Sequence, residues 1–250
     1  MKKAFTLLEL LVVIAIIAIV SSLLISSVSR AKVASARAIS AHSLSEMIAA
    51  GNFYRAEHDN SFWPYRESVA GGVQWWFGFE TTASSKLPEG KRTCDYSKGP
   101  LGGYASASGG VKADPAFVQF SPQLKPKYQN GNFGYGYNNL LAADSAGVPR
   151  NAAQIAEPSQ MIVFATCAQV NTFQAPASSK RPMIEEFYMI DNMQRTAHFR
   201  HGSDALAAFL DGSVRPLSMD SDMLPGSLDS RMPSANIGVF KTNYVKQADW

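Results

Sequence analysis

The chain has 250 residues, a formal net charge of +3 and two cysteines, and 46% of its residues are hydrophobic. Its basic residues are scattered, apart from those at the N-terminal tip and just after the first apolar run, so we do not expect a nucleic acid partner. No phosphate-binding loop, nucleophile elbow, zinc-protease motif or dinucleotide fingerprint occurs, and we therefore expect no enzyme activity.

An apolar stretch near the N-terminus dominates the chain. Residues 10–29 contain no charge, no proline and no glycine. As a helix that rises about 1.5 Å per residue, this stretch is about 30 Å long, which matches the hydrocarbon core of a bilayer. A secretory signal peptide would have a shorter apolar core that ends in a small-x-small cut site. The sequence therefore predicts one membrane-spanning helix over residues 5–29.

One acid, Glu9, lies inside this apolar region, where an ionised side chain is costly and usually has a function. Alternatively, Glu9 could lie at headgroup depth, solvated together with Lys2 and Lys3. The segment Ala4-Phe5-Thr6-Leu7-Leu8-Glu9-Leu10 and the two lysines before it resemble the processing site of type IV prepilins and type II secretion pseudopilins.

The resemblance implies that prepilin peptidase cuts between Ala4 and Phe5 and methylates the new amine of Phe5. It also implies that Glu9 meets the Phe5 amine of a neighbouring subunit. Pairing the carboxylate with the amine offsets the free-energy cost of burying each charge, and it specifies the register between subunits. Ala4 stands where the family usually has glycine, and the family's helix breakers near Ala18 and Ser26 are missing. We therefore expect a straighter, continuous helix.

An amphipathic helix half over residues 30–58 is expected to continue the span without a break. This part contains no proline and a single glycine, and its apolar residues recur on one side at helical spacing. We expect that side to pack on the sheet of the same subunit, with Gly51 letting a strand approach closely. The helix should end near residues 57–60, ahead of Pro64. The apolar side consists of Val33, Ala36, Ala41, Leu44, Met47, Ile48 and Tyr54.

Residues 59–250 are predicted to form a β-rich head, because all but one of the 18 glycines and 13 prolines lie in this part. The expected fold class is α+β, with the long N-terminal helix packed on an antiparallel β-sheet. Residues 95–110 and 175–182 are predicted loops. Strands are predicted over residues 73–80, 116–120, 161–167, 184–190, 196–201, 205–210 and 213–217, with a last edge strand at 239–244.

Aromatic residues gather between positions 62 and 79, and they favour a core against the stem helix over a platform for glycans or peptides. The two cysteines, Cys94 and Cys167, leave two interpretations open. In an oxidising compartment they could form a disulfide worth up to about 4 kcal/mol in the chain-entropy picture. They could equally be buried thiols.

The segment from His201 to Gly212 resembles the prepilin-associated H-x9-DG domain, since nine residues separate His201 from Asp211-Gly212. Turn residues at both ends predict a three-stranded meander over residues 196–217, with a type I′ hairpin at Asp211-Gly212. His201 and Asp211 would then lie at opposite ends of the middle strand, about 23 Å apart. We therefore favour structural roles for them over a catalytic pair.

Metal sites are weakly indicated. His198 and His201 have a helical ligand spacing but would lie on opposite faces of a strand. Asp220, Asp222 and Asp229 could offer oxygen ligands to calcium, for which a C-terminal loop of major pseudopilins is known, but no full ligand set is present. A solvated acidic turn is the expectation, with no metal and no cofactor.

The sequence and the resemblance together predict a pilin-like subunit, made as a single-pass precursor in the bacterial inner membrane with a leader over residues 1–4. Its head is expected in the periplasm or on an extracellular filament. Expected partners are prepilin peptidase, other pilin or pseudopilin subunits, the secretion or pilus assembly machinery and membrane lipid. The subunit would assemble into a type II secretion pseudopilus or a type IV pilus-like filament. The alternative is a membrane-anchored periplasmic ligand-binding protein or enzyme that uses the helix only as a tether.

Overall fold

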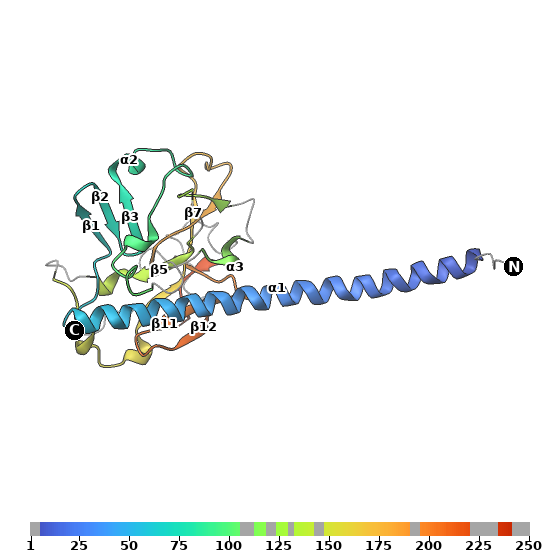
Figure 1. The fold of residues 1–250 in the computed structure, drawn as a ribbon, viewed down its shortest axis with the longest axis horizontal. Helices are drawn as coiled ribbons and strands as arrows, with labels where there is room; N and C mark the ends of the chain where they lie inside the picture. Colours follow the sequence, from blue (N-terminus) through green and yellow to red (C-terminus); the bar gives the residue numbers. More distant parts are fainter. Residues whose placement is uncertain are drawn as a thin grey trace.

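A computed structural model describes residues 6–105, 113–118, 124–129, 133–142, 148–190, 196–220 and 235–241. Its longest element is α1, Leu7–Glu57, a helix of 51 residues. The C-terminal part of α1 lies along the head, and its N-terminal part projects beyond the head (Figure 1). The first buried residue of α1 is Ala36, so the helix changes from a solvent-facing rod to a core element there.

The continuous helix expected from the missing glycine and proline is confirmed. Helix α1 has no break between the apolar span and the amphipathic half. It ends at Glu57, and the next turn contains Asp59 and Asn60 with positive φ angles of 51° and 59°. These left-handed residues reverse the chain and start the head.

The strands of the described residues form four sheets, and the largest, with order β12-β11-β6-β5-β9, lies against α1. Its ladders are antiparallel except for the parallel pair β5 and β9. The α+β class is therefore confirmed, with sheets that are partly mixed. The five strands are β5 Tyr135–Asn138, β6 Ile162–Thr166, β9 Met189–Ile190, β11 Asp204–Phe209 and β12 Val214–Ser218.

The smaller elements build the outer part of the head. The strands are β1 Arg66–Val69, β2 Gly72–Trp75 and β3 Gly78–Thr81 in one antiparallel sheet; β4 Leu124–Lys125, β7 Gln169–Asn171 and β8 Met183–Glu185 in another; and the pair β10 Ala197–His198 and β13 Ile237–Gly238. The short helices are α2 Thr82–Ser85, α3 Pro115–Val118, η1 Tyr96–Lys98, η3 Asn139–Leu141, η4 Ala152–Gln154 and η5 Pro158–Gln160.

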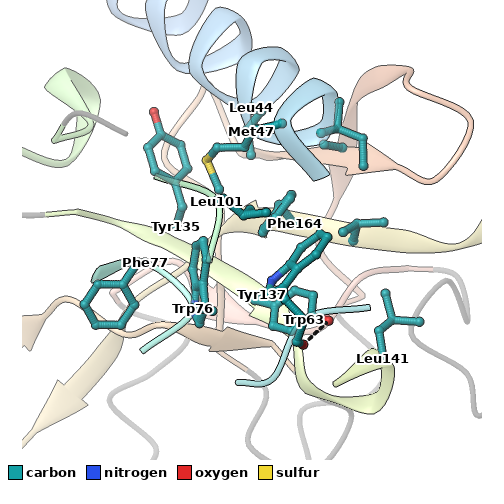
Figure 2. Close-up of a cluster of buried hydrophobic side chains, with 14 of the residues drawn as sticks. Leu44, Met47, Trp63, Trp76, Phe77, Leu101, Tyr135, Tyr137, Leu141 and Phe164 are labelled. Carbon is teal, nitrogen blue, oxygen red and sulfur yellow. Dashed lines mark hydrogen bonds between the residues drawn. The ribbon is translucent and has the colours of Figure 1, made fainter. Parts of the chain in front are cut away.

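Trp63 is a fully buried member of the main core cluster, together with Tyr137 and Phe164 of the large sheet (Figure 2). Its ring stacks on Tyr137 and Phe164 at centroid distances of 5.0 and 5.6 Å. A Cβ atom on Gly51 would lie only 2.7 Å from this indole. Gly51 thus permits a close approach, but of the Trp63 ring and not of a strand as the sequence suggested. The aromatic cluster is mainly core, as expected, since Phe62, Trp63, Trp76 and Phe77 are all buried.

Two predicted strands are each divided into two. The run over residues 73–80 turns at Trp76 and Phe77, because both rings are buried in the core and the Trp76 indole N–H donates to the Tyr188 carbonyl at 2.8 Å. The run over residues 184–190 changes sheets at Glu186, whose carboxylate is turned to the backbone N–H of Phe133 at 2.6 Å. Tertiary contacts override the local strand pattern in both cases.

The predicted strand at 116–120 is wrong, because the described part of this segment is the short helix α3. The preceding carboxylate, Asp114, accepts the Ala116 N–H at 2.8 Å and starts that helix. The predicted edge strand at 239–244 is also displaced: the strand observed is β13, and residues 242–244 lie outside the described residues.

The predicted strands over 161–167, 205–210 and 213–217 are confirmed as β6, β11 and β12. The three-stranded meander over 196–217 is wrong, however. Only β11 and β12 form a hairpin, whereas β10 pairs with β13 from the C-terminal region. The reason is that His201, Gly202 and Ser203 make a tight turn with two positive φ angles, at Gly202 and Ser203, which directs the chain away from β10.

Cys94 and Cys167 are both buried thiols and are not joined by a disulfide. Cys94 belongs to the main core cluster and Cys167 to a second cluster on the other side of the large sheet. Burial raises the pKa of the Cys94 thiol well above its usual range, which keeps it protonated. Of the two interpretations that the sequence left open, the structure shows the buried thiols.

Candidate functional site

The most distinctive surface of the molecule is the apolar rod formed by Leu7 to Val28 of α1. Its large side chains are between 43 and 81% exposed, and none of its most apolar window is buried against the head. By length and composition, this is the one described helix that can cross a membrane. In water such a surface would drive aggregation, whereas in a bilayer it is the ordinary surface of a spanning helix.

Hydroxyl groups in the second half of the rod are satisfied within the helix. Ser22 donates to the Ile19 carbonyl at 2.7 Å, and Ser26 donates to the Leu23 carbonyl at 2.9 Å. Ser29 makes the same kind of bond to the Ile25 carbonyl at 3.0 Å. The serines therefore cost little in an apolar environment, which is compatible with a helix in lipid.

The N-terminal end of the rod carries a capping box made by Thr6 and Glu9. The backbone N–H and the hydroxyl of Thr6 both donate to Glu9 Oε2 at 2.8 Å, and the Glu9 N–H donates to the Thr6 hydroxyl at 3.2 Å. Both donors contact the same carboxylate oxygen. Among the described residues no donor contacts Oε1, so that oxygen can accept a hydrogen bond from another molecule. The predicted cleavage site, Ala4 and Phe5, lies outside the described residues.

A buried ionic link ties α1 to the head. Arg200 and Asp114 form a salt bridge in which both side chains are 0% exposed. The Asp114 carboxylate also accepts the Ser40 hydroxyl of α1 at 2.7 Å, and the Arg200 guanidinium donates to the Gly134 carbonyl at 2.5 Å. The guanidinium also lies 5.1 Å from the centre of the Phe117 ring. The Arg200–Asp114 pair thus connects the helix, a loop and the sheet. The sequence alone did not indicate this pair, because Asp114 and Arg200 are 86 residues apart.

The H-x9-DG residues surround β11 without meeting each other. His201 precedes this strand and its N–H donates to the Asp204 carbonyl at 2.9 Å, whereas Asp211 and Gly212 follow the strand. Burial and the neighbouring Arg200 charge lower the pKa of His201 to about 4, so its ring is neutral near pH 7. A neutral, buried histidine at one end and an exposed aspartate at the other end cannot share a proton or a metal.

The second turn of the motif is not the predicted type I′ turn. Gly212 has a φ of +90°, but Asp211 has no positive φ, and the Gly212 N–H donates to the Phe209 carbonyl at 2.9 Å. This is a type I turn with a glycine bulge, a common three-residue hairpin. The Asp211 carboxylate accepts the N–H and hydroxyl of Ser213 at 2.9 and 2.7 Å, which fixes the turn.

The head also contains other buried ion pairs. Arg92 donates twice to Glu80, at 2.7 and 2.6 Å, and Lys125 lies 2.6 Å from Glu185. Within the part of the chain that the structure describes, no group of three His, Cys, Asp or Glu side chains is placed to hold a metal ion. Asp222 and Asp229 of the acidic loop lie outside that part. The charges of Arg92, Glu80, Lys125 and Glu185 are therefore used in ion pairs within the described head.

These features define a membrane-anchored protein with a long N-terminal helix and a β-rich head. Residues 1–25 match the family described as the prokaryotic N-terminal methylation motif. The chain is thus pilin-like: this motif, the long helix and the α+β head agree with type IV pilin-like proteins and pseudopilins. The motif implies processing by prepilin peptidase and assembly with other pilins. Neither a curated protein nor a solved structure matches the chain.

Proposed function

We propose that this chain is a pilin-like structural subunit that assembles through α1 into a type II secretion pseudopilus or a type IV pilus-like filament. The observation that carries the proposal is the apolar rod, Leu7 to Val28, which contributes nothing to the core of its own head. A helix of this kind is stable only among lipids or among other apolar helices. Exchange of lipid contacts for helix contacts is the step that a filament subunit requires.

Maturation is the first part of the proposal. Prepilin peptidase would cut between Ala4 and Phe5, remove a leader of residues 1–4 and methylate the Phe5 amine. The match of residues 1–25 to the methylation motif supports this order of events. Intact-mass analysis of protein purified from membranes tests it, because the mature chain should begin at Phe5 and carry one methyl group. A mature chain that begins at Met1 contradicts it.

Glu9 is proposed to direct assembly by accepting the Phe5 amine of a neighbouring subunit. The capping bonds of Thr6 occupy Oε2 and leave Oε1 for that amine. Pairing the carboxylate with an ammonium offsets the cost of holding each charge in an apolar bundle. Such a pair would set the axial register between two subunits.

Two substitutions at Glu9 separate the charge from the cap. Glu9→Gln keeps an oxygen that can accept the Thr6 N–H but removes the negative charge, and Glu9→Leu removes both. We expect both variants to insert into the membrane at normal levels and to lose filament assembly, measured by shearing and by cross-linking between subunits. Normal assembly of Glu9→Gln would overturn the ion-pair role, and normal function of both variants would indicate a mere tether.

The arrangement proposed for the cell is a rod in the bacterial inner membrane and a head in the periplasm or on the filament surface. The precursor would then comprise the leader, the span over residues 5–29, the stem over 30–58 and the head over 59–250. For His201, Asp211 and Gly212 we propose structural roles. The turn bonds of Asp211 and the burial of His201 against α1 support those roles.

A further inference from the structure

A groove lies where α1 passes from the apolar rod to the head. Its described lining comes from one face of α1, with Ser29, Arg30, Val33, Ala34 and Arg37, and from the turn that holds His201 and Gly202. The lining is almost entirely apolar, although two of its residues are arginines. The stems of these arginines therefore form part of the wall, while their guanidinium groups remain charged.

The position of the groove relative to the apolar rod is informative. The rod ends at Val28, and the lining residues of α1, from Ser29 to Arg37, span about 12 Å along the helix axis. The first part of that length, from Ser29 to Ala34, corresponds to about one headgroup layer of a bilayer whose hydrocarbon core the rod fills. The groove therefore opens at the depth of the lipid phosphates and glycerol groups.

The charges around the groove are not fully matched by the head. Arg37 lies 3.9 Å from Asp204, and 41% of its side chain is exposed. Arg30 is exposed and has no acidic partner among the described residues. An apolar slot bordered by two guanidinium groups fits a molecule with an apolar body and an anionic head. At this depth in a membrane, such a molecule is a phospholipid.

We propose that the groove between Ser29–Arg37 of α1 and the His201–Gly202 turn binds one anionic phospholipid. The glycerol and first acyl carbons lie in the apolar slot, and the phosphate contacts Arg30 and Arg37. The lipid thereby occupies the groove between the apolar rod and the head while the subunit is in the membrane. This proposal rests on the membrane anchor alone and does not require filament assembly.

Lipid binding to the purified full chain in detergent tests the proposal, with native mass spectrometry as the readout. Dioleoylphosphatidylglycerol is titrated in parallel with dioleoylphosphatidylcholine. A basic residue near a membrane surface contributes about fivefold in affinity for anionic lipid. We therefore expect Arg30→Gln/Arg37→Gln to lose about 25-fold in affinity for phosphatidylglycerol and to change little for phosphatidylcholine. The charge-matched control, Lys86→Gln/Lys91→Gln, alters exposed residues that follow α2 in the chain, and α2 lies on the opposite side of the head from α1 (Figure 1).

A second pair of variants tests the groove itself. Ala34→Trp places a large ring in the slot, whereas Ser35→Trp places the same ring on the opposite face of α1, by the 3.6-residue period. Both residues are exposed, so neither ring has to enter the core. We expect Ala34→Trp to reduce phosphatidylglycerol binding at least tenfold and Ser35→Trp to leave it unchanged.

Three results would overturn the proposal. One is equal affinity of the native chain for the two lipids. Another is unchanged phosphatidylglycerol binding by Ala34→Trp. The third is dimerisation in detergent that Ala34→Trp abolishes while lipid binding persists, which would assign the groove to a second copy of the chain. Loss of assembly in the Glu9 variants with intact lipid binding would leave this proposal standing, so the two hypotheses fail separately.

Discussion

At the scale of single residues, the head is organised around buried charges that are matched across long sequence distances. Arg200 and Asp114 are the clearest case, since both side chains are fully buried and the Ser40 hydroxyl of α1 joins them. A buried ion pair adds little net stability, but the loss of one member leaves a charge without compensation. The pair therefore fixes how α1 is seated on the head.

Asp114→Ala should lower the free energy of unfolding by about 3–5 kcal/mol, because it leaves the buried Arg200 guanidinium without its carboxylate. Lys98→Ala, which breaks an ion pair whose side chains are 66 and 43% exposed, is the control and should cost less than about 1 kcal/mol. Denaturant unfolding of the purified chain in detergent measures both. Equal effects of the two substitutions would contradict the role of the buried pair.

Glu186 gives the head a predictable dependence on pH. Burial raises the pKa of this carboxyl to about 7, although the Phe133 N–H bond opposes the rise. The folded state then binds more protons than the unfolded state between the ordinary glutamate pKa and pH 7. Stability should therefore fall as the pH rises through this window, by at most about 1.4 kcal/mol per pH unit.

Glu186→Gln removes the carboxyl group that binds the extra proton in the folded state. The slope of the free energy of unfolding against pH should therefore become less negative between pH 5 and pH 7. Glu67→Gln, in the exposed strand β1, should leave the slope unchanged. Denaturant unfolding at a series of pH values measures the slopes. The same slope in the native chain and in Glu186→Gln would show that Glu186 is ionised throughout.

At the scale of elements, the packing of α1 depends on one small residue. Gly51 is buried, and a Cβ atom there would lie 2.7 and 2.9 Å from two carbons of the Trp63 ring. Trp63 is itself fully buried and packs on both Tyr137 and Phe164, so it has little room to shift. Glycine has a lower helix propensity than alanine, but at position 51 it leaves the space that the Trp63 indole occupies.

Gly51→Ala should destabilise the head by up to about 2 kcal/mol, since overpacking costs about 1–3 kcal/mol and the gain in helix propensity is about 1 kcal/mol. Ser45→Ala, on the exposed face of the same helix, should be neutral or slightly stabilising. Thermal unfolding of the two variants measures the contrast. A stabilised Gly51→Ala would mean that the Trp63 ring moves at no cost.

At the scale of the whole molecule, the chain consists of a rod without a core and a head with one. The core begins at Ala36, and the residues from 7 to 28 contribute no buried side chain to it. Lipid or neighbouring helices must therefore cover the rod, while the head has its own buried clusters. This division is what allows one helix to serve both membrane anchoring and proposed assembly.

Deletion of residues 1–28 should give a head that is soluble in aqueous buffer and keeps its cooperative unfolding. The full chain should remain with the membrane fraction and require detergent for extraction. Fractionation and circular dichroism measure the two outcomes. An insoluble deletion variant would show that the rod also stabilises the head.

The sequence alone determined the span, the stem and the N-terminal motif, because a helix in lipid depends on an uninterrupted run of local residues and needs no distant contact. It also located β6 and β11, which are buried apolar runs, and β12, which is partly exposed. The tertiary structure alone decided the breaks at Trp76 and Glu186, the helix at Pro115 and the partner of β10, because distant residues stabilise each of them. The Arg200–Asp114 link and the groove beside Arg30 likewise arise only when remote segments meet.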